Sequence, residues 1–386
     1  MHFSKEIGES LTYKFAQAVG EMKAQGREII SLGLGEPDFT TPDYVIDATI
    51  AALKGGHTHY SATQGLPELR KKIAERATAD YGVSYDASEV IVLPGIKPAV
   101  YDALAAILEP FDEVINITPY YVSYPSMIKL AEPTAEIVSV PLNKDYTLNT
   151  DTLKAAFNKN TKAILVNSPH NPTGMVFSKD EVEMIIRLCL ENDTYLIADE
   201  VYEKLTFSGN VFTSFAKYAE IKDRLVFTNG YSKSHAMTGW RLGYAVGPKS
   251  LIVKMNKIQQ HVNTNTCTFI QKGACSIYDH VPEHLVSYVK ALEDRVTYFD
   301  KAVQDIKIFK GTKPKAGFFY FVDISATGMD SNTFCVKLLQ ETGIATTPGL
   351  AFGYDWDDHV RFSLAVPMAT LEKAVGLIKD FVEKNT

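Results

Sequence analysis

Short apolar runs alternate with stretches of helical period along most of the chain. The runs are rich in Val and Ile and lie at Val90–Leu93, Glu113–Ile117, Ala135–Val140, Lys162–Val166, Tyr195–Ala198, Leu225–Thr228 and Leu242–Val246. Because they lack polar alternation, they predict strands that are buried on both faces. Stretches of helical period lie before and between them, at Asp43–Leu53, Pro67–Tyr81, Pro98–Leu108 and Lys179–Glu191. This alternation predicts an α/β fold with a mostly parallel sheet that helices cover on both sides.

The two ends of the chain follow a different pattern. An amphipathic helix is predicted over Phe3–Gly26, and a long helical region over Leu251–Val303 leads the chain out of the sheet. Beyond that region the pattern predicts two helices and two strands, at Phe318–Asp323 and Val360–Leu364. We therefore expect three parts: an N-terminal arm and helix (1–42) that contribute to a small domain, a large domain (43–285) and a smaller C-terminal α+β domain (286–386).

The length and the charge of the chain limit its function. At 386 residues it is long enough for roughly two domains. Its formal net charge of −7 argues against binding to nucleic acid, which requires clustered Lys and Arg and a basic balance. An acidic protein can still hold a small anion, because the potential inside one pocket can be positive.

Cysteine usage and hydropathy indicate the compartment. The four cysteines form no C-x-x-C pair, and their scatter favours buried thiols in a reducing compartment. The N-terminus lacks the apolar core of a signal peptide, because it carries Lys5, Glu6, Glu9 and Lys14. No apolar run approaches the roughly 18 residues that a membrane span needs. We therefore expect a cytoplasmic protein with no membrane partner.

Candidate chemistry lies directly after the apolar runs, because ligands of open parallel sheets bind beyond the carboxyl ends of the strands. Pro94-Gly95-Ile96-Lys97-Pro98 follows the first run and opens a helix. Gly95 allows close backbone approach, and the free N–H groups of a helix start attract an anion. An ordinary strand-to-helix turn would have the same pattern, so this segment alone does not establish a phosphate site.

Two further segments place polar side chains at strand ends. In the loop Asn167–Gly174, two prolines and a glycine fix the backbone, and Asn171 can donate a hydrogen bond to a phenolate-like oxygen. Asp199 ends a buried run, and Tyr202 follows it. An unpaired charge there would cost several kcal/mol, so Asp199 needs a partner. A protonated pyridine nitrogen, a metal ion or an arginine would each serve.

The loop Gly230–Gly243 carries the most reactive candidate. It places Lys233 on a Ser- and Gly-rich turn, with Arg241 eight residues later. A desolvated lysine near other cations has a depressed pKa and becomes a nucleophile. An arginine can clamp a phosphate with its planar fork. A lysine in such a loop is commonly just solvated, but the four segments together match the parts of pyridoxal phosphate (PLP), whose sites pair a Schiff-base lysine with an acidic partner for the ring nitrogen.

The whole chain resembles the class I/II aminotransferases of PLP fold type I, in particular the bacterial and archaeal aspartate/aromatic aminotransferase branch. The motifs that carry this resemblance are Leu34-Gly35-Glu36-Pro37-Asp38-Phe39, Gly65-Leu66-Pro67-Glu68-Leu69-Arg70, Asn171-Pro172-Thr173-Gly174, Asp199-Glu200-Val201-Tyr202, Ser232-Lys233, Gly239-Trp240-Arg241-Leu242-Gly243-Tyr244, Pro314-Lys315-Ala316-Gly317-Phe318-Phe319-Tyr320 and Val360-Arg361-Phe362-Ser363. The resemblance implies a large PLP-binding domain with a mostly parallel seven-stranded sheet flanked by helices, and a smaller α+β domain.

The resemblance also implies a role for each candidate at the cofactor ring. Lys233 would form the Schiff base and later move a proton between the substrate and the cofactor. Asp199 would keep the ring nitrogen protonated. Tyr202 and Asn171 would hydrogen-bond the phenolic oxygen, and Tyr121 would stack on the ring where many relatives have Trp.

Other residues are implied to hold the phosphate and the substrate. The phosphate would be held by Gly95, Ile96, Lys97, Ser232 and Arg241, and by Tyr60 of the neighbouring subunit of a homodimer. Arg361 would bind the substrate α-carboxylate, with Asn171 and the Gly35 backbone assisting. Two positions need care. Gly230 stands where some relatives have a phosphate-binding Ser. Lys97 stands where some relatives have a lysine that binds the distal carboxylate of a dicarboxylic substrate, although it could also lie near the phosphate or in solvent.

The function implied is an aminotransferase that moves an amino group from an L-amino acid to a 2-oxo acid, with aspartate or an aromatic donor and 2-oxoglutarate. A PLP-dependent carbon–sulfur β-lyase, or another enzyme that eliminates at the α-carbon, remains as the alternative because it would use the same side chains. A dinucleotide site is not supported, because Gly33-Leu34-Gly35 lacks the third glycine of G-x-G-x-x-G. No metal site is expected either, since the pair His57 and His59 has no further ligands nearby in sequence.

Overall fold

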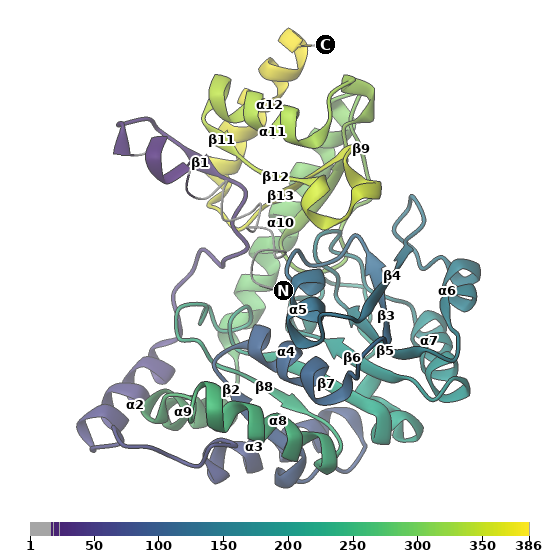
Figure 1. The fold of residues 1–386 in the computed structure, drawn as a ribbon. Coiled ribbons are helices and arrows are strands. Elements are labelled where there is room, and N and C mark those ends of the chain that lie inside the picture. Colours follow the sequence, from purple (N-terminus) through teal and green to yellow (C-terminus); the bar gives the residue numbers. More distant parts are fainter. Residues whose placement is uncertain (1–16, 18, 23, 386) are drawn as a thin grey trace.

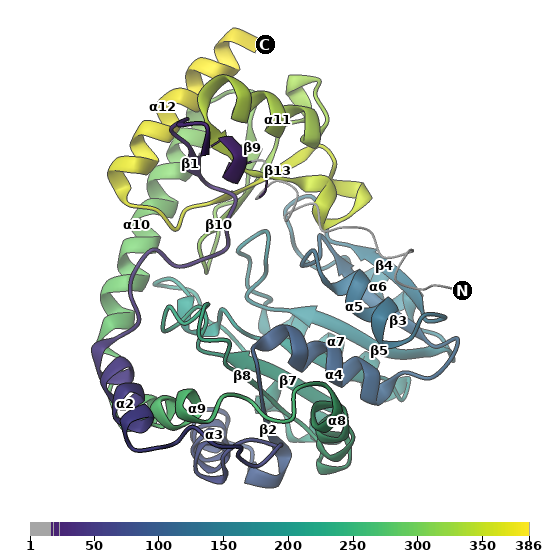
Figure 2. The same ribbon diagram turned by 60° about the vertical axis from the view of Figure 1, so that its left-hand side comes forward.

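The computed structural model describes residues 17, 19–22 and 24–385. These residues form a larger body around one sheet and a smaller body above it, as Figure 1 shows. Helix α10 (Glu283–Asp305) runs from one body into the other along one side of the molecule (Figure 2). The predicted helix Phe3–Gly26 falls largely outside the described residues; residues 19–22, inside it, are helical.

The sheet of the larger body has seven strands, as predicted. Their order is β2-β8-β7-β6-β5-β3-β4, and β8 is antiparallel to both of its neighbours while the other pairs are parallel. Each predicted run became one strand: β2 (Val90–Leu93), β3 (Glu113–Thr118), β4 (Glu136–Pro141), β5 (Thr161–Asn167), β6 (Tyr195–Asp199), β7 (Leu225–Gly230) and β8 (Gly243–Val246). The predicted fold class is thereby confirmed.

Helices cover both faces of this sheet because alternate strand residues enter different cores. On β2, Val90 and Val92 join one core, whereas Ile91 and Leu93 join the other. Side chains of helices α3 and α7 pack in the first core, and those of α4, α5 and α8 in the second. The helices of this body are α2 (Asp43–Lys54), α3 (Pro67–Tyr81), α4 (Ile96–Ile107), α5 (Tyr124–Ala131), α6 (Thr150–Ala156), α7 (Lys179–Glu191), α8 (Lys249–Val262) and α9 (Thr268–Ala274).

Strand β4 corrects the prediction that every run is buried on both faces. Of its six residues only Val140 is buried. Among the described strands, β4 lies at the edge of the sheet and pairs with β3 alone. Its run is Val- and Ile-rich, but no described strand pairs with its other side, so burial falls although the composition is that of an inner strand.

The predicted helical region Leu251–Val303 is interrupted. Helix α8 ends at Val262, and shortly after it Thr264 has a positive φ of 63°, which an α-helix cannot contain. Helix α9 follows, and α10 begins only after Pro282, whose fixed φ suits the residue before a helix. Helix α4 also differs from its predicted bounds. It begins at Ile96, two residues before Pro98, because a proline is tolerated in the first turn of a helix.

The smaller body contains two small sheets and a core of its own. Strand β1 (Ile30–Ser31) pairs in parallel with β11 (Ile344–Ala345). The other sheet has the order β12-β13-β10-β9. Its strands are β12 (Thr347–Pro348), β13 (His359–Ser363), β10 (Phe319–Asp323) and β9 (Lys310–Gly311). Helices α10, α11 (Ser331–Thr342) and α12 (Met368–Asn385) pack against these strands. The two strands and two helices predicted beyond the long helical region are therefore present.

Candidate active site

A cavity of about 930 Å³ opens between the carboxyl edge of the large sheet and the smaller body. Residues that lie far apart in sequence meet there. The predicted site residues that line it are Gly35, Ile96, Lys97, Tyr121, Asn171, Asp199, Tyr202, Ser232, Lys233, Arg241 and Arg361. Gly95 lies beside it, against the guanidinium of Arg241. Tyr60 does not line the cavity, and its side chain is 85% exposed.

Asp199 lies at the end of β6, where the sheet register sets it beside Asn167 of β5. Its carboxylate accepts a hydrogen bond of 2.8 Å from the Tyr124 hydroxyl and one of 3.3 Å from the Val201 backbone N–H. Burial raises the pKa of Asp199 to about 6, and these two donors and the nearby Lys233 oppose the rise. The carboxylate therefore stays ionised at neutral pH in spite of its burial.

Lys233 occupies the turn that follows β7. Its Nζ donates a hydrogen bond to the Gly35 carbonyl, which belongs to the segment after β1. Burial, together with the positive charge of Arg361, lowers the pKa of Lys233 to about 8. The amine is therefore neutral far more often than an exposed lysine, and a neutral amine is the nucleophilic form.

Arg361 of β13 is the buried cation of the cavity, with 4% of its surface exposed. Its guanidinium donates to the Asn171 side-chain oxygen (3.0 Å), the Gly33 carbonyl (2.7 Å) and the Thr347 hydroxyl (3.2 Å). It also lies 4.2 Å from the centre of the Phe319 ring. Burial lowers its pKa to about 10, so it remains charged at neutral pH. Among the residues that the structure describes, its buried Nε has no hydrogen-bond partner.

An anion cradle lies at the start of α4. Gly95 has φ of +104°, and a Cβ there would stand 2.6 Å from Nη2 of Arg241. A side chain at this position would displace the guanidinium, so glycine is required. Arg241 is held from the other side by a bond of 2.9 Å to the Thr238 carbonyl. The first N–H groups of the helix have no acceptor within it, and together with Arg241 they suit a phosphate.

Two residues that the sequence did not single out connect the predicted ones. Asn167 accepts a hydrogen bond of 2.8 Å from the Asn171 backbone and donates one of 2.9 Å to the Asp199 carbonyl. Tyr124 reaches Asp199, and its ring meets that of Tyr121 edge to face with centroids 5.4 Å apart. Asn167 could have been found from its place at a strand end. Nothing in the sequence distinguishes Tyr124 from its neighbouring tyrosines.

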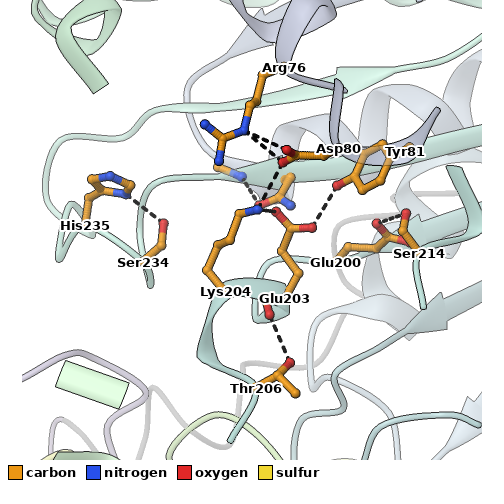
Figure 3. A network of polar contacts seen from close by, with 12 residues as sticks. Arg76, Asp80, Tyr81, Glu200, Glu203, Lys204, Thr206, Ser214, Ser234 and His235 are labelled. Atoms are coloured by element: carbon orange, nitrogen blue, oxygen red, sulfur yellow. Dashed lines mark hydrogen bonds and ion pairs between the residues drawn. The ribbon is translucent and has the colours of Figure 1, made fainter. Parts of the chain in front are cut away.

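A second group of polar side chains is drawn in Figure 3, and none of the residues labelled there lines the cavity. There Glu203 accepts from the Tyr81 hydroxyl at 2.7 Å and lies 3.4 Å from Lys204. Glu200, which follows Asp199, accepts from the Ser214 hydroxyl at 2.7 Å (Figure 3) and from the Phe215 backbone at 3.0 Å. These bonds hold the segment after β6 in place, and they therefore also help to hold Asp199, which ends that strand.

The donor set of the cavity fits pyridoxal phosphate part by part. The α4 start and Arg241 suit the phosphate, Asp199 suits a protonated ring nitrogen, and the amine of Lys233 suits the aldehyde. The volume lies in the range of cofactor and ligand sites, about 300–1,000 Å³. Within the described ranges, no group of three or more His, Cys, Asp or Glu is arranged to hold a metal ion. Nor is any helix of the described part long and apolar enough to cross a membrane.

Comparisons with known proteins agree with this geometry. Residues 27–378 match the family model for aminotransferase class I and II. The aspartate aminotransferase of Bacillus subtilis is 38% identical over 98% of this chain and 97% of its own length. That of Geobacillus stearothermophilus is 39% identical over 97% of this chain and 96% of its own length.

Solved structures give the same result. The aspartate aminotransferase from Thermus thermophilus with maleate has a TM-score of 0.93 at 33% identity, covering 99% of both chains. That from Rhizobium meliloti has a TM-score of 0.95 at 30% identity, covering 100% of this chain and 99% of that one. The predicted family and cofactor are confirmed. The chain belongs to the class I and II aminotransferases, PLP-dependent enzymes that transfer an amino group between an amino acid and a 2-oxo acid.

Proposed function

We propose that this enzyme transfers the amino group of aspartate, or of an aromatic L-amino acid, to 2-oxoglutarate, with the cofactor held covalently by Lys233. The observation that carries the proposal is one cavity that gathers a half-buried amine on Lys233 with a buried carboxylate on Asp199 and a buried guanidinium on Arg361. Pyridoxal phosphate sites pair a Schiff-base lysine with an acidic partner for the ring nitrogen, and a guanidinium suits a substrate carboxylate.

Bound pyridoxal phosphate supplies an electron sink for the substrate α-carbon. The protein supplies the proton transfers. Lys233 would take the proton from the substrate Cα and return one, and a pKa of about 8 suits both directions near neutral pH. Asp199 would keep the ring nitrogen protonated. Tyr202 and Asn171 would hydrogen-bond the phenolic oxygen, and Tyr121 would stack on the ring.

Arg361 binds the α-carboxylate of amino and 2-oxo acid alike. A guanidinium carries five N–H donors, and three hydrogen bonds to Asn171, Gly33 and Thr347 fix its orientation. The remaining donors are then held for the substrate in a preset plane; they include Nε, which has no partner among the described residues. Binding by a prearranged fork costs little conformational entropy, so it aligns the Cα–H bond for proton removal.

The choice of substrate rests on Lys97 and on the relatives. Lys97 lines the cavity, and its Nζ lies 5.4 Å from the centre of the Tyr121 ring, where it can meet a distal carboxylate. Several similar proteins are named aspartate or aspartate/prephenate aminotransferases, others an asparagine–oxo-acid transaminase and an aromatic aminotransferase, and the Thermus thermophilus structure contains maleate, a dicarboxylate. A dicarboxylic donor is therefore the first choice, with aromatic donors second.

A half-reaction screen tests this proposal. The purified enzyme is mixed with single amino acids without any 2-oxo acid, and the cofactor spectrum is followed. Aspartate should convert the cofactor to its amine form and release oxaloacetate in equal amount. Pyruvate and ammonia released from a cysteine-type donor, with no amine form, would instead indicate the β-lyase reaction. No conversion by aspartate or glutamate would refute the dicarboxylic preference.

We also propose a homodimer in which Tyr60 serves the phosphate site of the neighbouring subunit. The 85% exposure of Tyr60, outside its own cavity, supports this role. Hybrid dimers of a Lys233→Ala chain and a Tyr60→Ala chain test it, because one of the two shared sites would then be intact. The hybrid should regain about half of the wild-type activity, while each parent stays impaired. A hybrid no more active than its parents would contradict the shared site.

The compartment and the domain organisation complete the proposal. We propose that the enzyme works in the cytoplasm, since its four cysteines are free and three of them are buried. We also propose that residues 1–42 act with the small domain, 43–285 as the large PLP-binding domain and 286–386 as the small domain. Separate hydrophobic cores support this division, and the pairing of β1 with β11 supports the placement of the arm.

A further inference from the structure

Tyr124 occupies the first position of α5 and is 2% exposed. Its hydroxyl donates a hydrogen bond of 2.8 Å to Oδ2 of Asp199, and both groups are buried. A hydrogen bond to a charged acceptor is shorter and stronger than one between neutral groups, above all where water is excluded. This contact therefore bears on whether Asp199 is ionised and on how it is aimed.

Asp199 depends on Tyr124 more than on its other contacts. The Val201 backbone N–H is at 3.3 Å, a longer bond. Within the described part of the chain, no other side chain hydrogen-bonds this carboxylate. The other charged and titratable groups around it are Lys233, whose charge favours the ionised carboxylate, and Tyr202 and Glu200.

The hydroxyl itself remains a donor at every pH of interest. Burial and the negative charge of Asp199 raise the pKa of Tyr124 well above its usual value. Tyr124 also supports Tyr121, since their rings meet edge to face at 5.4 Å and the Tyr124 backbone N–H bonds the Tyr121 carbonyl at 2.9 Å. One side chain thus contacts both the residue expected at the ring nitrogen and the residue expected over the ring face.

We propose that Tyr124 is a positioning residue that keeps Asp199 ionised and aimed at the cofactor's ring nitrogen. The proposal rests on the proposed function, in which Asp199 holds that nitrogen protonated. Tyr124 touches neither substrate nor reacting atoms; it acts through Asp199. Without the Tyr124 hydroxyl, the buried carboxylate loses its strongest donor and takes up a proton more readily. A protonated Asp199 would no longer form an ion pair with the protonated ring nitrogen.

Cofactor binding to the apo-protein tests this without reference to activity. Tyr124→Phe keeps the ring and removes the hydroxyl, and it should weaken the affinity for pyridoxal phosphate by about tenfold. Tyr85→Phe is the matched control. Tyr85 is likewise buried, meets Phe227 edge to face and donates one bond of 2.9 Å to the Ala216 carbonyl, outside the cavity. Tyr85→Phe should leave the affinity for pyridoxal phosphate unchanged. Thermal unfolding of the apo-proteins checks that each variant is folded.

A double-mutant cycle with Asp199→Asn separates this proposal from the proposed function. Asp199→Asn alone should weaken binding, and adding Tyr124→Phe should weaken it little further, because the partner of the hydroxyl is already gone. If Asp199→Asn bound the cofactor as well as wild type, the role of Asp199 itself would be wrong. If Asp199→Asn weakened binding but Tyr124→Phe did not, or if the two effects added in full, the positioning role alone would be refuted.

The pH profile gives a readout that a purely structural loss would not move. Affinity should fall as the pH drops and Asp199 takes up a proton. In Tyr124→Phe the midpoint of that fall should move to higher pH, since the ionised carboxylate has lost a donor. An unchanged midpoint would overturn the proposal.

Discussion

The Arg361 guanidinium donates a hydrogen bond of 3.0 Å to the side-chain oxygen of Asn171, 190 positions earlier in the chain. Arg361 belongs to β13 of the smaller body, and Asn171 to the loop after β5 of the larger one. The bond therefore joins the two bodies at the cavity. A substrate carboxylate that binds Arg361 would bind to a group whose orientation both bodies fix, through Asn171 on one side and Gly33 and Thr347 on the other.

Replacing Arg361 by lysine should damage substrate binding. Arg361→Lys keeps the charge but loses the planar fork, so the contact to Asn171 and a two-point contact to a carboxylate cannot both form. We expect the KM for aspartate and the KM for 2-oxoglutarate to rise together by at least about tenfold, since changes at buried charged contacts cost about 2–5 kcal/mol. Steady-state kinetics measure both. Arg224→Lys, a change outside the cavity, is the control, and an effect on one substrate alone would be inconsistent with a shared α-carboxylate site.

Lys97 should discriminate between donors. If its ammonium binds a distal carboxylate, Lys97→Ala should lower kcat/KM for aspartate by about two- to fivefold, the value of a solvent-accessible charge pair. The value for tyrosine should change far less, because tyrosine has no second carboxylate. The exposed Lys301→Ala on α10 provides a control. Equal losses for the two donors would assign Lys97 to the phosphate or to general electrostatics.

The pH dependence of cofactor attachment should follow Lys233. Burial and the Arg361 charge lower its pKa to about 8, and the neutral amine is the form that attacks. The rate at which apo-protein attaches pyridoxal phosphate should therefore rise with pH and level off above about pH 8, not near the usual lysine value of about 10.4. Rapid-mixing absorbance between about pH 6 and about pH 10 measures this rate. An attachment rate that still rises steeply at about pH 10 would show that the pKa of Lys233 is not lowered.

Glu200 should make the stability of the apo-protein depend on pH. Burial and the neighbouring Glu203 raise the pKa of Glu200 to about 8, above the value of about 4.3 in an unfolded chain. The folded state then binds more protons than the unfolded state in this window, so stability is lost as the pH rises from about 4.3 to about 8. Glu200→Gln cannot ionise, and its amide can still bond Ser214 and Phe215.

The free energy of unfolding of Glu200→Gln should therefore rise relative to that of the wild type as the pH rises. We expect this difference to change by roughly 1–3 kcal/mol between about pH 5 and about pH 8. Denaturant unfolding at both pH values gives the difference. A variant that differs from wild type by the same amount at both would show that Glu200 ionises normally.

Strand prediction succeeded because composition reports local burial. All seven apolar runs became strands, and the helices Pro67–Tyr81 and Lys179–Glu191 have their predicted bounds. Helix α7 has a clear local signal, a capping box in which Ser178 and Glu181 bond each other's backbone. Helices α5 and α6 were missed, since α5 has only eight residues and α6 only seven, too few for a distinct period.

Site residues were predictable where the chain itself positions them. Asp199 and Asn171 follow directly from strand ends, and Lys233 and Arg241 share one loop. The hydrogen bonds of Tyr124 to Asp199 and of Lys233 to Gly35 span 75 and 198 positions, so they depend on tertiary packing that no local pattern encodes. The same holds for the break of the long helical region at Thr264, because the sequence there has neither Gly nor Pro to signal a positive φ.

The most direct test of the proposed function is to identify the lysine that carries the cofactor. The holoenzyme is reduced with borohydride, which makes the link between lysine and cofactor permanent, and the modified peptide is sequenced by mass spectrometry. We expect the pyridoxyl group on Lys233, and its loss in Lys233→Ala. The group on Lys97, which among the described lysines also lines the cavity, or on any other lysine would contradict this assignment.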